Sequence, residues 1–369
     1  MNIVILGLSI TSSWGNGHAT TFRGLVRELN KQGHHVLFLE RDVPWNTGKR
    51  DLPNPDYCQT ALYVSLEDLE VRFTEQVKQA DMVIVGSYVP QGVKVGEWVV
   101  NTAKGIKAFY DLDTPVTLAK LERGDYEYLH PDLIQKYDLY LSSTGGPTLE
   151  MLEQTYHAPM ARAFYRSVDP EVYFPKLVET KWDLGYQGIY SEERQPQLEK
   201  LMVDAAKQWP LGRFAVAGQQ FPGSIKWPAN VQYIEDMPAS EHQHFYNSQR
   251  FTLNITRADM ATVGYTPSAR LFEAAACCTP IITDNWDGLE TFFEPETEIL
   301  IASSAKDSLR YLREICKSDR KLIAERARKK VMANHTTTHR VNQLMRYVED
   351  LGATTYSIVN TKGTVSQAM

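Results

Sequence analysis

The chain has 369 residues, of which 43% are hydrophobic and 23% charged, and its formal net charge is -6 at pH 7. This composition is that of an ordinary globular protein, and it excludes the collagen-like, disordered and coiled-coil classes. The length favours two domains. Because the isoelectric point is near 5.9 and the chain has no long run of basic residues, we expect no nucleic-acid partner.

The four cysteines, at positions 58, 277, 278 and 316, are too few and too scattered for a disulfide framework, and their spacing is not that of a zinc site. The apolar N-terminus lacks the basic region of a secretory signal, and no stretch reaches about 18 apolar residues. We therefore expect a cytoplasmic protein with free thiols, no metal site and no transmembrane segment.

Short apolar runs alternate with helical patterns through the first half of the chain, which is typical of βαβ units and a parallel sheet. Between the first two runs, apolar residues recur at a helical spacing from Phe22 to Leu29, and Gly33 ends this helix. The expected strands are residues 2–7, 35–40, 81–86, 107–111, 139–143 and 161–165.

Residues 167–175, SVDPEVYFP, contain two prolines and no helical period, which indicates a connection between domains. After it, we expect strands at 184–190, 213–218, 231–234, 251–255, 280–283 and 298–301. The expected helices are 195–207, 239–248, 268–278, 289–294, 306–317 and 320–333. The predicted organisation is an N-terminal domain over 1–170, a C-terminal domain over 176–338, an amphipathic helix over 339–352 and a disordered tail over 353–369.

The loop SITSSWGNGH, residues 9–18, follows the first expected strand and lies where an open α/β sheet faces its ligand crevice. Gly15 and Gly17, with Asn16 between them, let backbone N–H groups approach a ligand closely. His18 begins the next helix. It is either a base that takes a proton from an alcohol or a helix residue without chemistry.

Three carboxylates lie at or just after the ends of expected strands in the first half of the chain. Asp111 and Asp113 are two residues apart, so on an extended segment their side chains point the same way. We expect either that one of them is catalytic or binds the acceptor, or that both stabilise the turn before Pro115. Glu40 follows Gly17 at the spacing of a ribose-binding acid, although solvation is the simpler interpretation.

The richest stretch in chemistry runs over residues 253–290. Here Ser268 or Ala269 begins a helix that carries Arg270 and Glu273 one turn apart. A helix N-terminus with a hydroxyl and a guanidinium nearby is suited to hold a diphosphate, and a carboxylate one turn later can accept from both hydroxyls of a ribose. The alternative is that Arg270 and Glu273 form an ordinary surface pair.

Several segments resemble the CgeB-like (spore maturation protein) family of GT-B glycosyltransferases, which have a glycosyl transferases group 1-like C-terminal domain. They are GNGHATTFRGLVREL, YDLDTPVTL, SVDPEVYFP, DLGYQGIYSEERQPQLEKL, SARLFEAAACCTPIITDNWDGLETFFEPETEIL and HTTTHRVNQLM. The resemblance implies an α/β fold in which two doubly wound, Rossmann-like parallel-sheet domains face a cleft, and a C-terminal helix crosses back. It also implies an acceptor in the N-terminal domain and a nucleotide-sugar in the C-terminal domain.

Residue roles follow from the same resemblance. Glu273 would contact the nucleotide ribose. The diphosphate would be held by Arg194, Ser268 and Arg270, and the loop after Ile234 would meet the base.

One position departs from the family pattern. Tyr265 stands eight residues before Glu273, where many retaining members have a second glutamate, so the sugar-binding carboxylate and the stereochemistry stay open. Because GT-B enzymes generally need no bound divalent cation, we expect no cofactor, and the Asp111-x-Asp113 pair is not interpreted as a metal motif.

The predicted function is therefore transfer of a sugar from a nucleotide-sugar, such as a UDP- or GDP-sugar, to a hydroxyl of an unknown acceptor (glycan, lipid, protein or small molecule). If the reaction inverts, Asp113 or His18 is the base; if it retains, no such base is needed. Residues 43–60 are expected to form a mobile lip that sets acceptor specificity. The alternatives are a catalytically degenerate nucleotide-sugar-binding or scaffold protein, an epimerase, and an NAD-dependent oxidoreductase, for which the G-x-G-x-x-G loop is missing.

Overall fold

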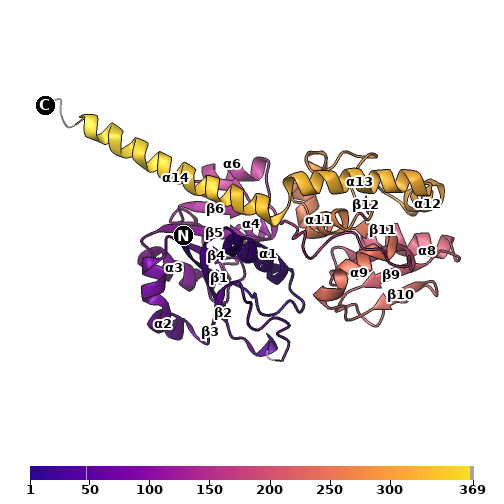
Figure 1. The fold of residues 1–369 in the computed structure, drawn as a ribbon, viewed down its shortest axis with the longest axis horizontal. Coiled ribbons are helices and arrows are strands. Elements are labelled where there is room, and N and C mark those ends of the chain that lie inside the picture. The colour runs from indigo at the N-terminus through magenta and orange to yellow at the C-terminus, as the bar shows by residue number, and fades with distance from the viewer. Residues whose placement is uncertain (47, 366–369) are drawn as a thin grey trace.

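The computed structural model describes residues 1–46 and 48–365, and it folds them into two α/β units that lie side by side (Figure 1). Within the described residues, each unit has one sheet whose strands are all parallel, with helices on both faces. The two doubly wound domains expected from the sequence are therefore present.

The first sheet has the strand order β3-β2-β1-β4-β5-β6-β7. Its strands are β1 (Asn2–Gly7), β2 (His35–Arg41), β3 (Gln59–Tyr63), β4 (Met82–Gly86), β5 (Ile106–Asp111), β6 (Leu139–Ser142) and β7 (Ala161–Ala163). The central strands β1 and β4 are almost fully buried, as their unbroken apolar sequences require in a sheet that is covered on both faces.

Helices cover both faces of this sheet. They are α1 (Gly17–Lys31), α2 (Leu66–Gln79), α3 (Gly92–Thr102), α4 (Thr114–Glu122), α5 (Pro131–Ile134) and α6 (Pro147–Gln154), with a 3-10 turn η1 (Pro44–Asn46) after β2. The apolar stripe of α1 packs Phe22 and Val26 against Ile5 and Phe38 of the sheet. The other face carries a second core around Val83, Val85 and Phe109.

The second sheet has the order β10-β9-β8-β11-β12-β13. Its strands are β8 (Trp182–Gln187), β9 (Phe214–Ala217), β10 (Val231–Ile234), β11 (Gln249–Asn254), β12 (Ile281–Thr283) and β13 (Leu300–Ile301). The helical segments are α7 (Gln195–Leu198), a π-helical turn η2 (Glu199–Val203), α8 (Asp204–Gln208), η3 (Ala239–Glu241), α9 (His242–Asn247), α10 (Ala258–Val263), α11 (Ala269–Ala276), η4 (Leu289–Thr291), α12 (Ala305–Glu314) and α13 (Lys317–Asn334).

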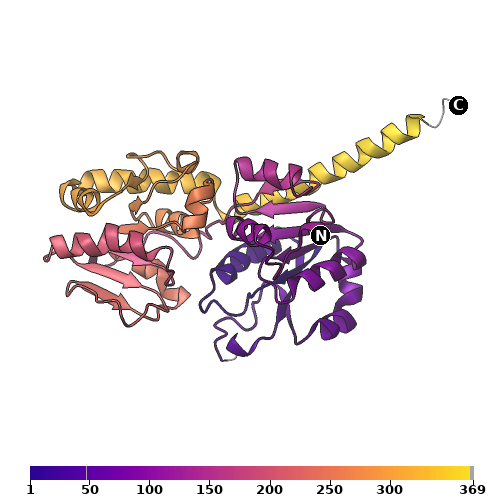
Figure 2. The same cartoon turned by 180° about the vertical axis from the view of Figure 1, so that it is seen from behind.

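The last helix, α14 (Thr337–Val365), leaves the C-terminal domain, lies over the N-terminal domain and extends past it (Figures 1 and 2). Val341 and Leu344 are fully buried in the N-terminal core beside α1. This is the crossing-back helix that the sequence predicts.

The two segments that connect the domains pair with each other. The Val168 N–H donates to the His335 carbonyl at 3.0 Å, and the Thr337 N–H donates to the Val168 carbonyl at 3.0 Å. Arg340 Nε then donates to the Tyr165 carbonyl at 3.0 Å. The domains are therefore connected by two chain segments that an isolated parallel β-bridge, between Val168 and Thr336, holds together.

The structure differs from the sequence-based expectation in several places; for example, helix α10 was not predicted. Strand β3 lies at the sheet edge and was not predicted. The helix expected over 289–294 is the 3-10 turn η4, which follows Gly288 in the left-handed region. Helix α14 continues to Val365, so residues 353–365 are helical where we predicted a disordered tail, and residues 366–369 lie outside the described part of the chain.

Candidate active site

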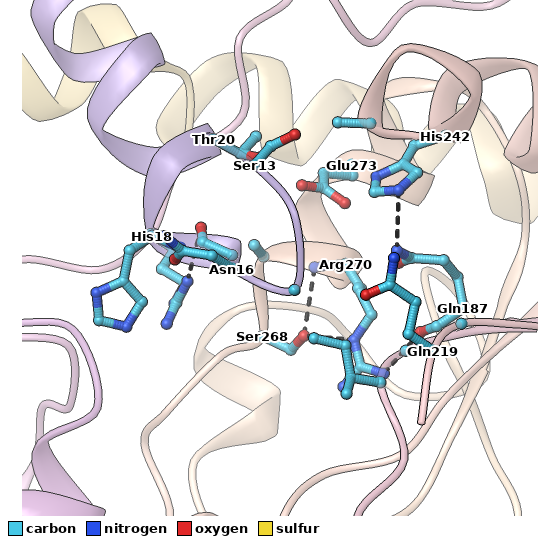
Figure 3. A pocket seen from close by; sticks show the side chains of 18 of the residues that line it. Ser13, Asn16, His18, Thr20, Gln187, Gln219, His242, Ser268, Arg270 and Glu273 are labelled. Carbon is cyan, nitrogen blue, oxygen red and sulfur yellow. Dashed lines mark hydrogen bonds between the residues drawn. The ribbon is translucent and has the colours of Figure 1, made fainter. Parts of the chain in front are cut away.

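A cleft of about 880 Å3 lies between the two domains, and loops from the carboxyl ends of both sheets line it. This volume is in the range of sites that hold small molecules and cofactors. In Figure 3, the start of α1 with Asn16 lies across from Ser268, Arg270 and Glu273 of the C-terminal domain, whereas the His18 ring points away from them. The structure therefore brings most of the predicted site residues together.

The glycine loop forms part of the N-terminal wall, as Gly15, Asn16 and Gly17 all line the cleft. Asn16 caps α1, and its side-chain oxygen accepts from the His18 N–H at 2.8 Å. Gly15 has a φ of 61°, a conformation that favours glycine. This cap fixes His18 at the beginning of the helix.

His18, Asp113 and Arg166 form a buried array on the same wall. His18 Nε2 lies 3.3 Å from Asp113 Oδ2, and Arg166 donates to Asp113 Oδ1 at 3.1 Å. Arg166 also donates to the Leu112 carbonyl at 3.1 Å. The His18 ring packs edge-on against Tyr88, with 5.3 Å between the ring centroids.

The electrostatics of this array set the protonation states. Burial alone would raise the pKa of Asp113, but the Arg166 charge and the His18 hydrogen bond outweigh it and lower the pKa to about 2. Burial lowers the pKa of His18, although the Asp113 hydrogen bond opposes this effect. At neutral pH, an ionised Asp113 therefore accepts the Nε2–H of a neutral imidazole. His18 Nδ1 then carries the lone pair; this atom is buried and has no hydrogen-bond partner among the described residues.

The two aspartates of the DLD sequence diverge, contrary to the expectation that they point the same way. Asp113 lines the cleft, whereas the Asp111 carboxylate is fully buried and accepts from Tyr140 Oη at 2.6 Å and Thr117 Oγ1 at 2.8 Å. Burial raises the pKa of Asp111 to about 6. Strand β5 ends at Asp111, so the alternation of an extended chain does not continue to Asp113.

Ser268 and Arg270 build the centre of the C-terminal wall. Ser268 is the N-cap of α11, and its Oγ accepts from Arg270 Nε at 3.1 Å. The Arg270 guanidinium also donates to the Gln187 and Ile255 carbonyls, each at 2.9 Å. These two carbonyls lie at the carboxyl ends of the neighbouring strands β8 and β11, so Arg270 is held at the centre of the sheet edge.

Glu273 lies one turn further along α11, lines the cleft and is only 7% exposed. Tyr246 donates its hydroxyl to Glu273 Oε2 at 3.1 Å. Burial raises the pKa of Glu273, while the Tyr246 hydrogen bond opposes the rise. Arg270 and Glu273 are therefore part of the cleft and not an exposed surface pair.

Two further arginines of the C-terminal domain line the cleft. Arg194 donates to the Ile189 carbonyl at 2.6 Å, and its Nε is buried without a partner among the described residues. Arg257 follows β11, and its Nε lies 3.6 Å from a Glu193 carboxylate oxygen. The charge of Arg257 also reaches across the cleft and helps to lower the pKa of Asp113.

Two predicted donor-binding residues do not line the cleft. Ile234 ends β10 in a small core, and it is the following loop, residues 236–240, that reaches the cleft. The Tyr265 ring lies between Gly146 of the N-terminal domain and Gly288, and a Cβ on either glycine would come within 2.5 Å of the ring. The Tyr265 carbonyl also accepts from the Gly145 N–H at 3.0 Å. Tyr265 thus joins the two domains at their contact.

Glu40 is fully buried and outside the cleft, so it is neither solvated nor placed to meet a ligand there. Its carboxylate accepts from the Ile10 N–H at 2.7 Å and from the Thr11 N–H and hydroxyl at 3.0 and 2.7 Å. Glu40 therefore shapes the beginning of the loop that carries Gly15 to His18.

Several cleft residues were missed from the sequence. They are Tyr88, Arg166, Gln187, Gln219, His242 and Arg257, whereas Trp14 and Lys49 lie in the segments 9–18 and 43–60 that were expected at the cleft. Tyr88, Arg166, Gln219 and Arg257 lie within three residues after the end of a parallel strand, and Gln187 is the last residue of β8. The rule that ligands bind beyond the carboxyl ends of parallel strands would have found these five.

Two absences concern the described residues only. Residues 1–46 and 48–365 contain no cluster of three or more histidine, cysteine, aspartate or glutamate side chains placed to bind a metal ion. Among the same residues, none of the helices has both the length and the apolar character needed to cross a membrane.

The chain resembles known proteins in sequence over its C-terminal portion and in fold over nearly its whole length. Residues 194–346 match the model of a family described as glycosyl transferase-like. A search of curated proteins found no match.

Solved structures that resemble this one cover nearly the whole chain. Sucrose-phosphate synthase from Thermosynechococcus elongatus is 14% identical, with a TM-score of 0.68 over 96% of this chain and 100% of that one. An alpha-glucosyltransferase in complex with UDP-glucose and DNA is 12% identical, with a TM-score of 0.69 over 94% and 99%. Anabaena HepE in complex with UDP and glucose is 12% identical, with a TM-score of 0.67 over 95% and 100%.

At these identities, the likeness establishes the fold. The chain has the GT-B architecture of two parallel-sheet α/β domains, as the sequence predicted. Its C-terminal portion is, in addition, glycosyl transferase-like in sequence.

Proposed function

We propose that this protein is a glycosyltransferase that moves a sugar from a nucleotide-sugar donor to a hydroxyl group of an acceptor. One observation carries the proposal: the cleft places the capped N-terminus of α11, with Ser268, Arg270 and Glu273, opposite the buried His18–Asp113 pair. The glycosyl transferase-like sequence of residues 194–346 supports it. We also propose a cytoplasmic location and membership of the CgeB-like group.

The C-terminal wall would bind the donor. Arg194, Ser268 and Arg270 would hold the diphosphate, Glu273 would accept from the ribose hydroxyls, and the loop at 236–240 would meet the base. UDP- and GDP-sugars are the donor classes to test first, because the neighbours named above include proteins in complex with UDP or UDP-glucose.

The arginines would stabilise the departing nucleoside diphosphate in the way that a bound cation does elsewhere. Arg194 and Arg270 are held by backbone carbonyls, so their charges are not cancelled by a carboxylate in contact. We therefore propose that transfer needs no divalent cation. Full activity after treatment with a chelator is the expected result, and loss of activity that Mg2+ or Mn2+ restores would overturn this part of the proposal.

The N-terminal wall would bind the acceptor. Of the two candidates for the base, His18 has a lone pair at Nδ1, whereas both Asp113 oxygens are engaged and the pKa of Asp113 is about 2. Because Nδ1 is buried, His18 would take a proton from the acceptor hydroxyl only if acceptor binding exposed this nitrogen. Asp113 would orient the imidazole and stabilise the imidazolium ion. An inverting reaction uses His18 in this way, whereas a retaining one needs no base on this face. The anomeric configuration of the product, measured by NMR, distinguishes the two.

A degenerate nucleotide-sugar-binding protein is the second candidate, and the position of Tyr265 favours it. Where many retaining enzymes have a sugar-binding glutamate, this chain has a tyrosine at the contact between its domains. Such a protein would bind the nucleotide-sugar without turning it over.

The decisive experiment is a calorimetric screen of nucleoside diphosphates and their sugars with the wild type and Glu273→Ala. Binding of one nucleotide that is lost in the variant is the expected result, and release of nucleoside diphosphate from the matching sugar then separates the enzyme from the degenerate protein. If no nucleotide binds the wild type, the glycosyltransferase proposal is wrong.

A further inference from the structure

An aromatic ring and an unpaired ammonium group lie together at the N-terminal rim of the cleft. Trp14 is 38% exposed, although it is a large apolar side chain, and it lines the cleft. Lys49 Nζ lies 3.2 Å from the centre of a Trp14 ring. Neither residue takes part in the array of His18, Asp113 and Arg166, so the proposed chemistry does not account for them.

The backbone under this pair is firmly held. The Asp51 carboxylate accepts from the Ser13 N–H and hydroxyl, each at 2.8 Å, and from two Arg23 nitrogens at 2.8 and 2.9 Å. The Ser12 hydroxyl donates to the Lys49 carbonyl at 2.8 Å. The two rim segments are therefore hydrogen-bonded to each other and to α1.

The charged groups on this wall differ in whether they have a partner of opposite charge. Asp51 is neutralised by Arg23; burial alone would raise its pKa, but the Arg23 and Ser13 hydrogen bonds outweigh burial and lower it. On the same wall, Asp113 pairs with Arg166. Lys49 has no carboxylate partner among the described residues, and its ammonium rests only against the indole. A cation–π contact at an exposed site contributes about 0.5–1 kcal/mol, so a ligand anion can readily compete for this ammonium.

We propose that Trp14 and Lys49 form an acceptor subsite for an anionic saccharide, a sugar that carries a phosphate or a carboxylate group. The indole presents an electron-rich face to the C–H groups of a sugar ring, which carry partial positive charge. The ammonium group pairs with the anion. This inference rests on the proposed function, because it places the acceptor at the N-terminal wall, and it deepens that function by naming the class of acceptor.

The subsite is separate from the groups proposed to bind the donor. Arg194 and Arg270 belong to the C-terminal wall and are held at its strand ends. The donor diphosphate would occupy those arginines and leave Lys49 for a second anion. A neutral acceptor would use the Trp14 face but would leave the Lys49 charge without a partner.

The test is a binding measurement with three named probes: glucose 6-phosphate, glucuronate and glucose. Each is titrated by ligand-observed NMR into the protein saturated with the nucleoside diphosphate that it binds. Lys49→Met keeps the length of the stem and removes the charge, and Lys49→Arg keeps the charge. Lys136→Met is the matched control, because Lys136 is exposed and lies outside the cleft.

The wild type is expected to bind at least one anionic probe about tenfold more tightly than glucose, as one charge-assisted contact allows. Lys49→Met should abolish this preference, while Lys49→Arg and Lys136→Met should keep it. Trp14→Leu should weaken all three probes alike. The better of the two anionic probes identifies the group as phosphate or carboxylate.

The inference is overturned if the wild type shows no preference for an anionic probe, if no probe binds, or if Lys49→Met keeps the preference. Calorimetry of the nucleoside diphosphate in the same samples shows whether the acceptor inference fails alone or together with the proposed function. If the nucleotide binds and the preference is absent, only the acceptor inference fails. If no nucleotide binds, the proposed function itself fails.

Discussion

The two walls of the cleft hold their arginines in different ways. On the N-terminal side, Arg166 pairs with Asp113, and Arg23, which lies behind the wall, pairs with Asp51 of the cleft, so each of these charges meets a carboxylate. On the C-terminal side, Arg270 donates to two backbone carbonyls. Arg194 likewise donates to a carbonyl, whereas Arg257, 3.6 Å from a Glu193 carboxylate oxygen, is the exception on this wall. A carbonyl orients a guanidinium without cancelling its charge.

Because of this difference, we expect the C-terminal wall to determine nucleotide affinity and the N-terminal wall to determine the rate of transfer. The C-terminal wall keeps positive charge at fixed positions, which is what an anionic ligand needs from a preorganised site. The N-terminal wall pairs its arginines with carboxylates, holds a neutral imidazole and keeps one ammonium group, that of Lys49, at its rim. Substitutions on one wall should therefore change nucleotide affinity, and substitutions on the other should change turnover.

The largest effect is expected for His18→Ala. Loss of a positioned acid–base group lowers turnover by about 100-fold or more, while the Kd of the nucleoside diphosphate should stay within about twofold. The measurement is the rate of nucleoside diphosphate release from the nucleotide-sugar, together with calorimetry. Because burial lowers the pKa of His18, the wild-type rate should persist below pH 6.5 before it declines.

Asp113→Asn is the matched partner of that variant, since it keeps the shape of the side chain but loses the negative charge beside the imidazole. It should also reduce turnover and spare nucleotide affinity. If His18→Ala and Asp113→Asn each lost nucleotide affinity as much as turnover, the two walls would not have the separate roles described above.

Arg270→Met should have the next largest effect, on affinity. Removing a guanidinium that lines the cleft should weaken nucleoside diphosphate binding by about 30-fold, or about 2 kcal/mol, the value of a hydrogen bond to a charged group. Arg270→Lys should recover only part of the loss, because it cannot reach Ser268 and both carbonyls at once. Arg313→Met, at an exposed site outside the cleft, is the control.

Glu273→Gln should produce a smaller and more selective loss. The amide keeps the shape but offers a weaker acceptor to the ribose, so nucleoside diphosphate affinity should fall by about tenfold. A 2′-deoxynucleoside diphosphate, which lacks one ribose hydroxyl, should lose less. Calorimetry of both nucleotides with both proteins gives the coupling, and an identical loss for the two would argue against ribose binding by Glu273.

The strands that were predicted well are those whose sequence is a continuous apolar run. The strands β1 and β4 are buried on both faces, and such burial leaves a clear pattern in the sequence. Strand β3, with the sequence QTALY, pairs only with β2 at the edge of the sheet and is largely half-buried. An edge strand of this kind has neither a continuous nor an alternating pattern, so it could not be recognised.

The residues of the candidate site also fall into two groups, those that the local sequence predicted and those that it did not. His18, Ser268, Arg270 and Glu273 lie at helix starts that follow glycine or serine, and local sequence was enough to find them. Arg166 and Arg257 belong to no local motif and could have been found only by their places just after the ends of parallel strands. Tyr265 was assigned to the donor site by its spacing from Glu273, yet its ring lies between two glycines that are distant from each other in sequence.

The smallest expected effect is on the free energy of unfolding, and it involves two histidines, His242 of the C-terminal domain and His335 at the end of α13. Burial lowers the pKa of His242 to about 4 and that of His335 to about 3. His242 lies within 3.3 Å of the Gln187 amide, and Arg340 donates to His335 Nδ1 at 2.7 Å. Both rings are therefore neutral in the folded protein, whereas in the unfolded chain each titrates near pH 6.5.

Between pH 6.5 and the folded-state values, the unfolded chain binds more protons than the folded one, so the free energy of unfolding falls as the pH falls. Each histidine should account for about 1 kcal/mol between about pH 7 and 5.5. Urea unfolding of His242→Gln should show a shallower pH dependence than the wild type, while His35→Gln, at an exposed position, should leave it unchanged. An unaltered pH dependence in His242→Gln would mean that this ring has the same pKa in the folded protein as in the unfolded chain, and the C-terminal wall would then gain a positive charge below about pH 6.5.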